Sequence, residues 1–325
     1  MNAPFVLRNA RERHEHFVSE LLAGLQDHPK HSSPKFFYDA EGSALFERIC
    51  DLPEYYLTRT EIALLRNHSA EIANYMGRDV ELIEFGAGAL KKVRVLLDAL
   101  DRPRAYVPVD ISGDYLRGVT RQLSQSCPDL SIHPVIADFT KDFVLPPIDA
   151  ARRIGFFPGS TIGNLNRSEA LAFLRKAAML LRGGGLLIGV DLVKDPAILH
   201  AAYNDAAGIT ALFNKNMLAR ANRELDADFD VEKFAHYAFY DPLEQRIEMH
   251  LVSLTDQRAT VAGEHVSFKE GETIHTENSC KYTPAGFRAL AVEAGFTPRA
   301  AWYDPEHLFS LHWLEAPGTK PFRTR

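Results

Sequence analysis

The chain has 325 residues, 46% of them hydrophobic and 25% charged, which is typical of a globular protein with one large core and a smaller companion domain. Its formal net charge of −6 offers no basic surface to a polyanion, so we expect no nucleic-acid partner. Three widely spaced cysteines, a charged beginning (MNAPFVLRNARERHEHF) and no apolar run near 18 residues argue against a disulfide framework, a zinc site, export and a membrane span. These features favour the cytoplasm.

The first regular pattern is helical and begins near Thr58. Thr58 to Glu61 (TRTE) reads as a capping box, and Ile62, Leu65 and Ile72 recur at helical spacing. The pattern predicts a helix that leads into the apolar run VELIEF.

Short apolar runs then alternate with helical segments. Five of them follow one another at 80–85, 105–112, 132–140, 153–161 and 186–193. This alternation predicts a parallel sheet with helices on both faces. The helix after the fourth run, Ser168–Leu181, has Ser168 as its expected cap and stops at Gly183.

The pattern changes after residue 195. Residues 197–235 read as helices and residues 236–274 contain alternating strand patterns. We interpret this stretch as an insertion with its own architecture. The core resumes with a helix at 283–295 and two apolar runs, RAAWYDP and FSLHWLEA, which predict an antiparallel hairpin at the sheet edge.

Two glycines and two acids mark a ligand site at the strand ends. Gly86 and Gly88 follow the first strand, where glycine allows a ligand to approach the backbone. Asp110 ends the second strand, 22 residues after Gly88, where a carboxylate can accept both hydroxyls of an adenosine ribose. Asp138 ends the third strand, where it could accept from the adenine amine. Alone, each could be a tight turn or a helix cap; together they predict an adenosine pocket.

The kind of adenosine cofactor follows from a missing glycine. The run Gly86-Ala87-Gly88-Ala89 lacks the third glycine of a dinucleotide fingerprint, which disfavours NAD. The closing hairpin is typical of class I S-adenosylmethionine methyltransferases, whose Rossmann-like α/β fold has a mostly parallel seven-stranded sheet ending in an antiparallel hairpin. That analogy concerns the fold and names no substrate.

Other stretches carry a more specific resemblance. SPKFFYDAEGSALFERICDLPEYYLTRTE and HTENSCKYTP, with FFPGSTIGNL and AAYNDAAGIT between them, resemble the histidine Nα-methyltransferases of ergothioneine biosynthesis. The resemblance covers nearly the whole chain. It implies an enzyme that transfers methyl groups from S-adenosyl-L-methionine to the α-amine of free histidine, three in succession, giving hercynine.

The resemblance also assigns roles to individual residues. It implies that Asn164 and Tyr203 bind the substrate carboxylate, and that the imidazole is held by Tyr55, Glu277 and Ser279 with Met249 beside it. Tyr38, the expected catalytic residue, and the backbone near Gly159 would face the α-amine. The cofactor would contact Tyr38, Phe46, Gly86, Lys92, Asp110, Asp138 and Phe139, with Gly88 in the same turn. No metal ligand is implied.

The residue types suit this chemistry. A glutamate and a hydroxyl can bind an imidazole at its charge and at its N–H, and both would be left unpaired by an apolar side chain. The methyl donor is already activated, so the enzyme mainly has to align a neutral amine. An α-amine titrates near about 8, so we expect Tyr38 to orient the lone pair more than to remove a proton.

Departures from the family pattern concern cofactor and substrate affinity. Ala87 and Ala89 stand where actinobacterial members carry hydroxyls, and this leaves Lys92 rather than Lys91 as the matching lysine. Asn278 is polar where an aliphatic residue is expected beside the imidazole pocket.

The resulting prediction is a two-domain enzyme. Residues 60–195 and 283–325 would form the methyltransferase core, and residues 1–59 and 196–282 an α+β substrate-binding domain, with the active site using both. We expect a monomer. The alternatives are an Nα-methyltransferase for tyrosine or tryptophan, which would lack the imidazole grip, and a non-catalytic adenosine-binding regulatory protein, which would need neither substrate site.

Overall fold

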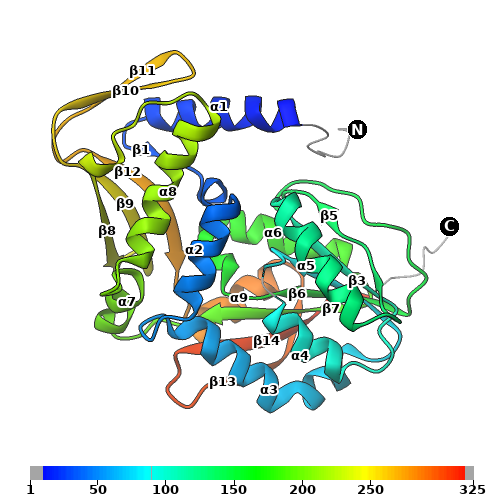
Figure 1. The fold of residues 1–325 in the computed structure, drawn as a ribbon. Coiled ribbons are helices and arrows are strands. Elements are labelled where there is room, and N and C mark those ends of the chain that lie inside the picture. Colours follow the sequence, from blue (N-terminus) through cyan, green and yellow to red (C-terminus); the bar gives the residue numbers. More distant parts are fainter. Residues whose placement is uncertain (1–9, 89, 319–325) are drawn as a thin grey trace, which may run out of the picture. The chain divides into compact units, whose positions relative to one another are not determined.

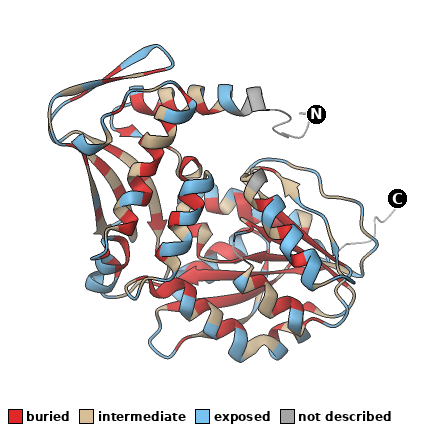
Figure 2. Ribbon diagram, in the orientation of Figure 1, coloured by how far each residue is buried: buried red, intermediate tan, exposed pale blue. Residues whose placement is uncertain are grey.

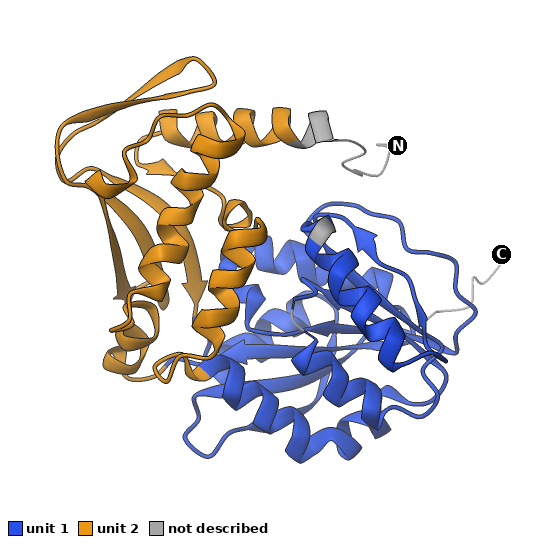
Figure 3. Cartoon of the chain, viewed as in Figure 1, with its two compact units in different colours: residues 1–6, 57–193, 281–325 blue, residues 7–56, 194–280 orange. Residues whose placement is uncertain are grey.

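The computed structural model describes residues 10–88 and 90–318. Ala89, one of the two alanines of the glycine-rich turn, lies outside these residues. The described chain forms two compact units (Figure 3): unit 1 contains residues 57–193 and 281–318, and unit 2 contains residues 10–56 and 194–280. Unit 2 is therefore built from two segments that are far apart in the sequence.

A mostly parallel sheet forms the centre of unit 1 (Figure 1). Its strands lie in the order β13-β14-β7-β6-β2-β3-β4, and β5 also pairs with β3. All neighbours are parallel except the pairs that β14 makes with β7 and β13. The strands are β2 (Val80–Phe85), β3 (Ala105–Asp110), β4 (Ser131–Ile132), β5 (Val135–Ile136), β6 (Arg152–Phe157), β7 (Gly185–Asp191), β13 (Thr297–Tyr303) and β14 (Phe309–Glu315).

The predicted parallel sheet with a closing antiparallel hairpin is confirmed, and its strands occupy the seven predicted positions, the last of which holds two short strands that both pair with β3. Within the described residues the sheet has eight strands, because the third apolar run is split into β4 and β5. Pro134 lies between these two short strands. Proline has no N–H to donate, so it interrupts the hydrogen-bond ladder with β3.

Helices flank the unit 1 sheet. On one face, α6 and α9 contribute Phe173, Leu174, Phe287 and Leu290 to a core shared with β2, β3, β7 and β14. On the other face, Tyr75 of α3 contacts Trp313 of the sheet, with ring centroids 6.1 Å apart. The strands β2 and β7 are buried along their whole length (Figure 2). The helices are α3 (Tyr56–Met76), α4 (Lys91–Ala99), α5 (Gly113–Ser126), α6 (Arg167–Leu180), α9 (Pro284–Glu293) and the 3-10 turn η2 (Thr161–Asn164).

Two predicted helix caps are wrong. Helix α3 begins at Tyr56, so Thr58 and Glu61 lie inside the helix and do not form its capping box. Helix α6 is capped by Asn166, whose side chain accepts from the Glu169 N–H while the Glu169 side chain accepts from the Asn166 N–H. Ser168 lies in the first turn and donates to the Asn166 side chain.

Unit 2 is an α+β structure. Its main sheet has the order β1-β12-β9-β8, with β1 parallel to β12 and the other pairs antiparallel, and β10 and β11 form a separate hairpin. The elements are α1 (Ala10–Gln26), β1 (Lys30–His31), η1 (Pro34–Phe37), α2 (Ala40–Cys50), α7 (Pro196–Tyr203), α8 (Ile209–Glu224), η3 (Val231–Lys233), β8 (Phe234–Asp241), β9 (Arg246–Ser253), β10 (Gln257–Val261), β11 (Glu264–Phe268) and β12 (Thr273–Cys280).

One face of the unit 2 sheet is buried under α8. Along β9 the buried residues alternate with partly exposed ones, and Ile247, Met249 and Leu251 are all at most 1% exposed. Asn214 of α8 accepts from Thr276 Oγ1 of β12 at 2.7 Å. This alternation fixes which side chains of the sheet face α8. Within the described residues, no helix is both long enough and apolar enough to cross a membrane.

Candidate active site

The glycine-rich turn of unit 1 follows β2 directly. Gly86 has a φ of +71°, which favours glycine, and its N–H donates to Val109 O of β3 at 2.9 Å. A Cβ on Gly88 would have no atom within 4 Å among the described residues. The turn therefore leaves free space beside its backbone at the carboxyl ends of the strands. An adenosine cofactor needs such space to approach the backbone closely.

Asp110 and Asp138 lie at the ends of neighbouring strands, as predicted. Asp110 Oδ1 accepts from the Ser112 N–H at 2.7 Å. Burial raises the pKa of Asp110 to about 6, although hydrogen bonds from Ser112 and Ile111 oppose this rise. Asp138 Oδ1 accepts from the Thr140 N–H at 2.9 Å, and the next residue, Phe139, packs its ring on Phe157. A ligand with hydroxyl donors would satisfy the buried Asp110 carboxylate, so this site fits a ribose.

A buried carboxylate connects two of the predicted site residues. Glu61 of α3 is 0% exposed. Its two oxygens accept from the Gly159 N–H at 3.0 and 2.9 Å, and Lys92 Nζ of α4 lies 2.6 Å from Oε2. Asn164 ends the η2 turn that follows the same loop. Thus unit 1 brings Lys92 and Gly159 together, and they are joined by a residue whose sequence context indicated only a helix cap.

Aromatic rings of unit 2 surround Tyr38. The Tyr38 ring contacts Phe46 of α2 edge to face, with centroids 5.8 Å apart, and Phe213 of α8 at 5.6 Å. Phe46 in turn contacts Tyr55 at 6.2 Å, and Tyr55 contacts Tyr203 at 6.4 Å. Burial raises the pKa of Tyr55 well above its usual value. The Tyr55 phenol is therefore neutral at physiological pH and can both donate and accept a hydrogen bond.

The residues predicted to hold an imidazole share one face of the unit 2 sheet. Glu277 of β12 pairs with Met249 of β9, and Ser279 pairs with Ile247. Tyr203 donates its hydroxyl hydrogen to Ser279 Oγ at 2.7 Å. Met249, Tyr203 and Ser279 are 1%, 6% and 4% exposed. A carboxylate, a serine hydroxyl and a phenol are therefore gathered in largely buried surroundings.

Comparison with known proteins decides the family. The family model of the histidine-specific, S-adenosylmethionine-dependent methyltransferases matches residues 17–316. This chain belongs to that family. It is 44% identical to histidine N-alpha-methyltransferase from Mycolicibacterium smegmatis and 42% identical to the protein of that name from Mycobacterium tuberculosis, each over 90% of this chain and 92% of the relative. It is 32% identical to ergothioneine biosynthesis protein 1 of Neurospora crassa over 89% of this chain and 33% of that protein.

As a member of the histidine-specific methyltransferases, the chain has the α/β fold of S-adenosylmethionine-dependent enzymes, as predicted. Glu61 and Phe213 contact predicted site residues, but their sequence context did not indicate it. Glu61 matched a local capping signature, and Phe213 lies in an amphipathic helix where a phenylalanine is most simply read as core. Neither residue carried a sequence signal for its contact, because the partners lie far away in the chain.

Two of the predicted departures from the family pattern have a structural outcome. Ala87 is 1% exposed, so its methyl group is part of the core. Asn278 pairs with Glu248 and lies on the face of β12 opposite to Glu277 and Ser279. The Asn278 side chain therefore points away from the sheet face that carries Glu277 and Ser279.

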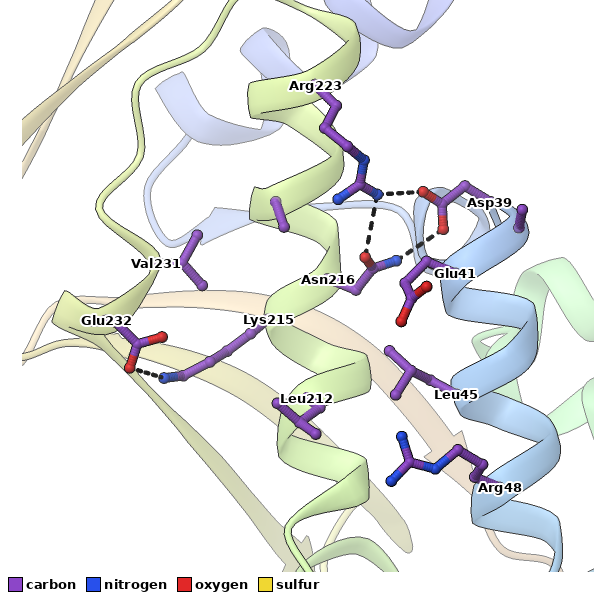
Figure 4. Close-up of a pocket in the computed structure, with 12 residues that line it drawn as sticks. Asp39, Glu41, Leu45, Arg48, Leu212, Lys215, Asn216, Arg223, Val231 and Glu232 are labelled. Carbon is purple, nitrogen blue, oxygen red and sulfur yellow. Dashed lines mark hydrogen bonds and ion pairs between the residues drawn. The ribbon is translucent and has the colours of Figure 1, made fainter.

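A groove of about 650 Å³ lies between α2 and α8 of unit 2 (Figure 4). At one end Asn216 and Arg223 of α8 point at Asp39, with hydrogen bonds of 2.9 and 2.5 Å. Burial would raise the pKa of Asp39, but hydrogen bonds from Gly42, Asn216 and Arg223 bring it below its usual value. The groove's charged groups thus pair largely with one another, and the predicted site residues do not line it.

Three side chains on the outer face of the unit 2 sheet form a cluster with metal-ligating atoms. One such atom from each of Glu248, His250 and His275 lies within 4.8 Å of the other two. Arg246 donates two hydrogen bonds to Glu248 Oε1, at 2.8 and 2.6 Å, and His250 Nε2 lies 3.0 Å from Oε2. Both carboxylate oxygens are therefore engaged by protein groups, and the cluster is best described as a hydrogen-bond network.

Proposed function

We propose that this chain transfers methyl groups from S-adenosyl-L-methionine to the α-amine of free L-histidine, three times in succession, giving hercynine. This would be the first step of ergothioneine biosynthesis. The family assignment and the relatives at 42 and 44% identity support the reaction type and the substrate. The relative named ergothioneine biosynthesis protein 1 supports the pathway, and the number of transfers is what the resemblance implies.

The arrangement of Tyr203, Ser279 and Glu277 supports histidine most directly. The Tyr203–Ser279 hydrogen bond orients a hydroxyl on the same sheet face as the Glu277 carboxylate. An imidazole offers an N–H and a nitrogen lone pair, so a carboxylate and a hydroxyl can bind both at once. A phenyl ring offers neither group and an indole offers only an N–H, so at least one of these two protein groups would be left unpaired, which costs binding free energy.

The remaining roles concern orientation. When bound, the cofactor supplies a methyl group already activated on a sulfonium, so the protein mainly has to align the amine. We propose that Asn164 and Tyr203 bind the substrate carboxylate, and that Tyr55 and Met249 border the imidazole. Tyr38 and the backbone near Gly159 would face the amine.

We propose that the cofactor is held chiefly by unit 1 residues at the strand ends. Asp110 would accept from the ribose, and Asp138 from the adenine amine. The other proposed contacts are Gly86, Gly88, Lys92 and Phe139, with Tyr38 and Phe46 contributed by unit 2. The open backbone at Gly88 and the buried Asp110 carboxyl support this assignment.

We further propose a cytoplasmic monomer. Cys50, Cys127 and Cys280 form no disulfide among the described residues, which favours a reducing compartment. Size-exclusion chromatography with light scattering would test the monomer, since a mass near twice 36.4 kDa would contradict it.

The activity is tested by incubating the purified protein with S-adenosylmethionine and each amino acid separately. Mass spectrometry should show successive methyl additions to histidine. Methylation of tyrosine or tryptophan in place of histidine would contradict the proposal, and no methylation of any amino acid would favour a non-catalytic protein.

The Glu277→Leu variant tests the imidazole site. We expect its kcat/KM for histidine to fall at least about 100-fold, because the charged partner of the imidazole is lost, while its preference shifts toward aromatic amino acids. Glu264→Leu is the control, since Glu264 is exposed on the β10–β11 hairpin of the same unit. Equal effects of the two substitutions would argue against a role of Glu277 in substrate binding.

A further inference from the structure

The loop that follows β6 has a strained backbone. Gly159 has a φ of +75°, and the next residue, Ser160, has a φ of 56° and a ψ of 28° although it is not glycine. Ser160 is also buried, with 3% of its surface exposed. A non-glycine residue in the left-handed region is strained by its Cβ and persists only where its surroundings hold it. Such strain is concentrated at functional sites, so the contacts that hold this loop are informative.

Glu61 holds the loop from the side of α3. Both of its carboxylate oxygens accept the Gly159 N–H, at 3.0 and 2.9 Å. Its negative charge is compensated by Lys92 Nζ at 2.6 Å. Space for the carboxylate comes from Gly189 of β7, because a Cβ at that position would lie 2.2 Å from Glu61 Oε1. The lack of a side chain at Gly189 therefore leaves room for the buried Glu61 carboxylate.

A backbone hydrogen bond holds the loop from the side of β7. The Asp191 N–H donates to Ser160 Oγ at 2.9 Å. The Asp191 side chain pairs with Lys281 Nζ at 2.8 Å, and both side chains are 0% exposed. Of the two loop residues with left-handed backbone, Gly159 is therefore held by the Glu61 carboxylate and Ser160 by the backbone of Asp191, whose own side chain is fixed in a buried ion pair.

Stability alone does not account for this arrangement. Buried ion pairs lose much of their attraction to desolvation, and well-packed apolar residues are often at least as stabilising. What a buried ion pair provides is a defined geometry. Here the geometry joins Gly159, whose backbone is proposed to face the substrate amine, to Lys92, which is proposed to contact the cofactor. A Cβ on Gly159 would lie only 3.2 Å from Lys92 Nζ.

We propose that Glu61 is a positioning residue that fixes the Gly159 loop against Lys92, and so sets the substrate amine in line with the methyl group of the cofactor. This inference rests on the proposed function for the roles of Gly159 and Lys92. The clamp itself lies within unit 1. Because methyl transfer depends steeply on alignment, loosening the loop should affect turnover more than binding.

Glu61→Gln and Glu81→Gln form a matched pair of variants. Glu81 is also a 0% exposed glutamate of unit 1, paired with Arg153 Nε at 2.9 Å, but it is the second residue of β2 and lies at the opposite end of the strand from the glycine-rich turn. We expect Glu61→Gln to lower kcat at least about tenfold and to change the Kd of S-adenosylhomocysteine less than about threefold, since Lys92 keeps its charge. Glu81→Gln should keep kcat near the wild-type value. A Glu61→Gln kcat within threefold of wild type would overturn the proposal.

NMR spectroscopy of the Gly159 amide tests the contact with Glu61 independently of activity. Selective labelling of the 20 glycines with ¹⁵N and assignment through a Gly159→Ala spectrum identify this resonance. In Glu61→Gln the Gly159 amide should shift and exchange its proton with solvent at least about tenfold faster than in wild type. A lowered kcat with an unchanged Gly159 amide would show that Glu61 does not act through the loop, and would also overturn the proposal.

Ser160→Ala provides a second route if Glu61→Gln does not fold. It removes the acceptor of the Asp191 N–H and loosens the same loop while leaving Glu61 in place. We expect a lowered kcat with an S-adenosylhomocysteine Kd near wild type, and an unchanged kcat would contradict the proposal. If the wild-type protein methylates another amino acid instead of histidine, the proposed substrate is wrong, yet the effect of Glu61→Gln on that reaction still tests the clamp.

Discussion

At the scale of single residues, Tyr38 is the group proposed to lie nearest the reacting amine. Its ring is held between Phe46 and Phe213, at 5.8 and 5.6 Å, so removing the hydroxyl should leave the ring in place. We expect Tyr38→Phe to lower kcat about 10- to 100-fold while keeping the wild-type pH dependence, because an orienting hydrogen bond is lost and no base is removed. Rates measured from about pH 6 to 10 test this. Complete loss of turnover at every pH would show that Tyr38 is an obligatory base.

Glu84 is a third buried glutamate of unit 1, and its ionisation is unusual. Burial raises its pKa to about 8, and the negative charges of Glu61 and Asp110 add to this effect, whereas Lys92 and the Tyr106 hydroxyl oppose it. Tyr106 donates its hydroxyl hydrogen to Glu84 Oε2. Between about pH 4.5 and 8 the folded protein therefore holds a proton that the unfolded chain has released, so the free energy of unfolding should fall as pH rises through this window.

Glu84→Gln tests this ionisation, since glutamine resembles the protonated glutamic acid. We expect the stability of the variant relative to wild type to increase between about pH 5 and 8.5 by about 1 kcal/mol or more. Urea unfolding at a series of pH values measures the difference. If the two stability curves run parallel, Glu84 does not keep its proton in the folded protein.

At the scale of elements, the turn after β2 contains two glycines with different structural needs. Gly86 has a positive φ, and a Cβ there would lie 3.5 Å from Phe139 Cε1, whereas a Cβ on Gly88 would meet open space. Gly86→Ala should lower both the Tm and the affinity for S-adenosylhomocysteine. Gly88→Ala should leave the Tm nearly unchanged but weaken S-adenosylhomocysteine binding about tenfold or more, because its methyl group occupies the space proposed for the cofactor.

Gly118→Ala is the control for these two variants. Gly118 lies in α5 of the same unit, and a Cβ at this position would also meet open space. Calorimetric titration and thermal unfolding should show unchanged S-adenosylhomocysteine affinity and equal or slightly higher stability, since alanine favours a helix over glycine. If Gly88→Ala and wild type bind S-adenosylhomocysteine with equal affinity, Gly88 does not border the cofactor site.

The strands could be predicted because their signal is local. Buried strands such as β2 and β7 are continuous apolar runs, and β9 alternates with the period of a half-buried strand. The split of the third run also had a local sign in Pro134, but the apolar residues around this proline favour one continuous strand. Sequence patterns thus predicted the strand positions but not the break in the ladder.

The missed contacts depend on residues that are distant in the chain. Glu61 lies 98 positions from Gly159, and TRTE satisfies a local capping signature equally well. The same limit applies to Asn166 and Ser168, where two good cap residues lie two positions apart and only the helix start decides between them. A local sequence pattern shows that a residue such as Glu61 could cap a helix. Which role the residue has depends on the distant residues that it contacts in the folded chain.

At the scale of the whole molecule, the proposed contacts to adenosine and to the imidazole come from different units. The proposed adenosine contacts Asp110 and Asp138 belong to unit 1, and the proposed imidazole contacts Tyr55, Glu277 and Ser279 belong to unit 2. Each unit has its own sheet, so each can present its contacts on a separately folded framework. Binding of the cofactor and binding of histidine should therefore slow hydrogen exchange in different segments of the chain.

Hydrogen–deuterium exchange of the full-length protein, followed by peptide analysis, can measure this protection. S-adenosylhomocysteine alone should slow exchange in peptides covering 110–113 and 138–140, and in the peptide around Tyr38 and Phe46 if unit 2 also contacts the cofactor. Adding histidine should then slow exchange at 51–55 and 204–208, the loops beside Tyr55 and Tyr203. The β10–β11 hairpin carries no proposed contact and serves as the internal reference. Protection by histidine confined to 110–113 and 138–140 would reverse the proposed assignment, because the substrate would then occupy the strand ends meant for adenosine.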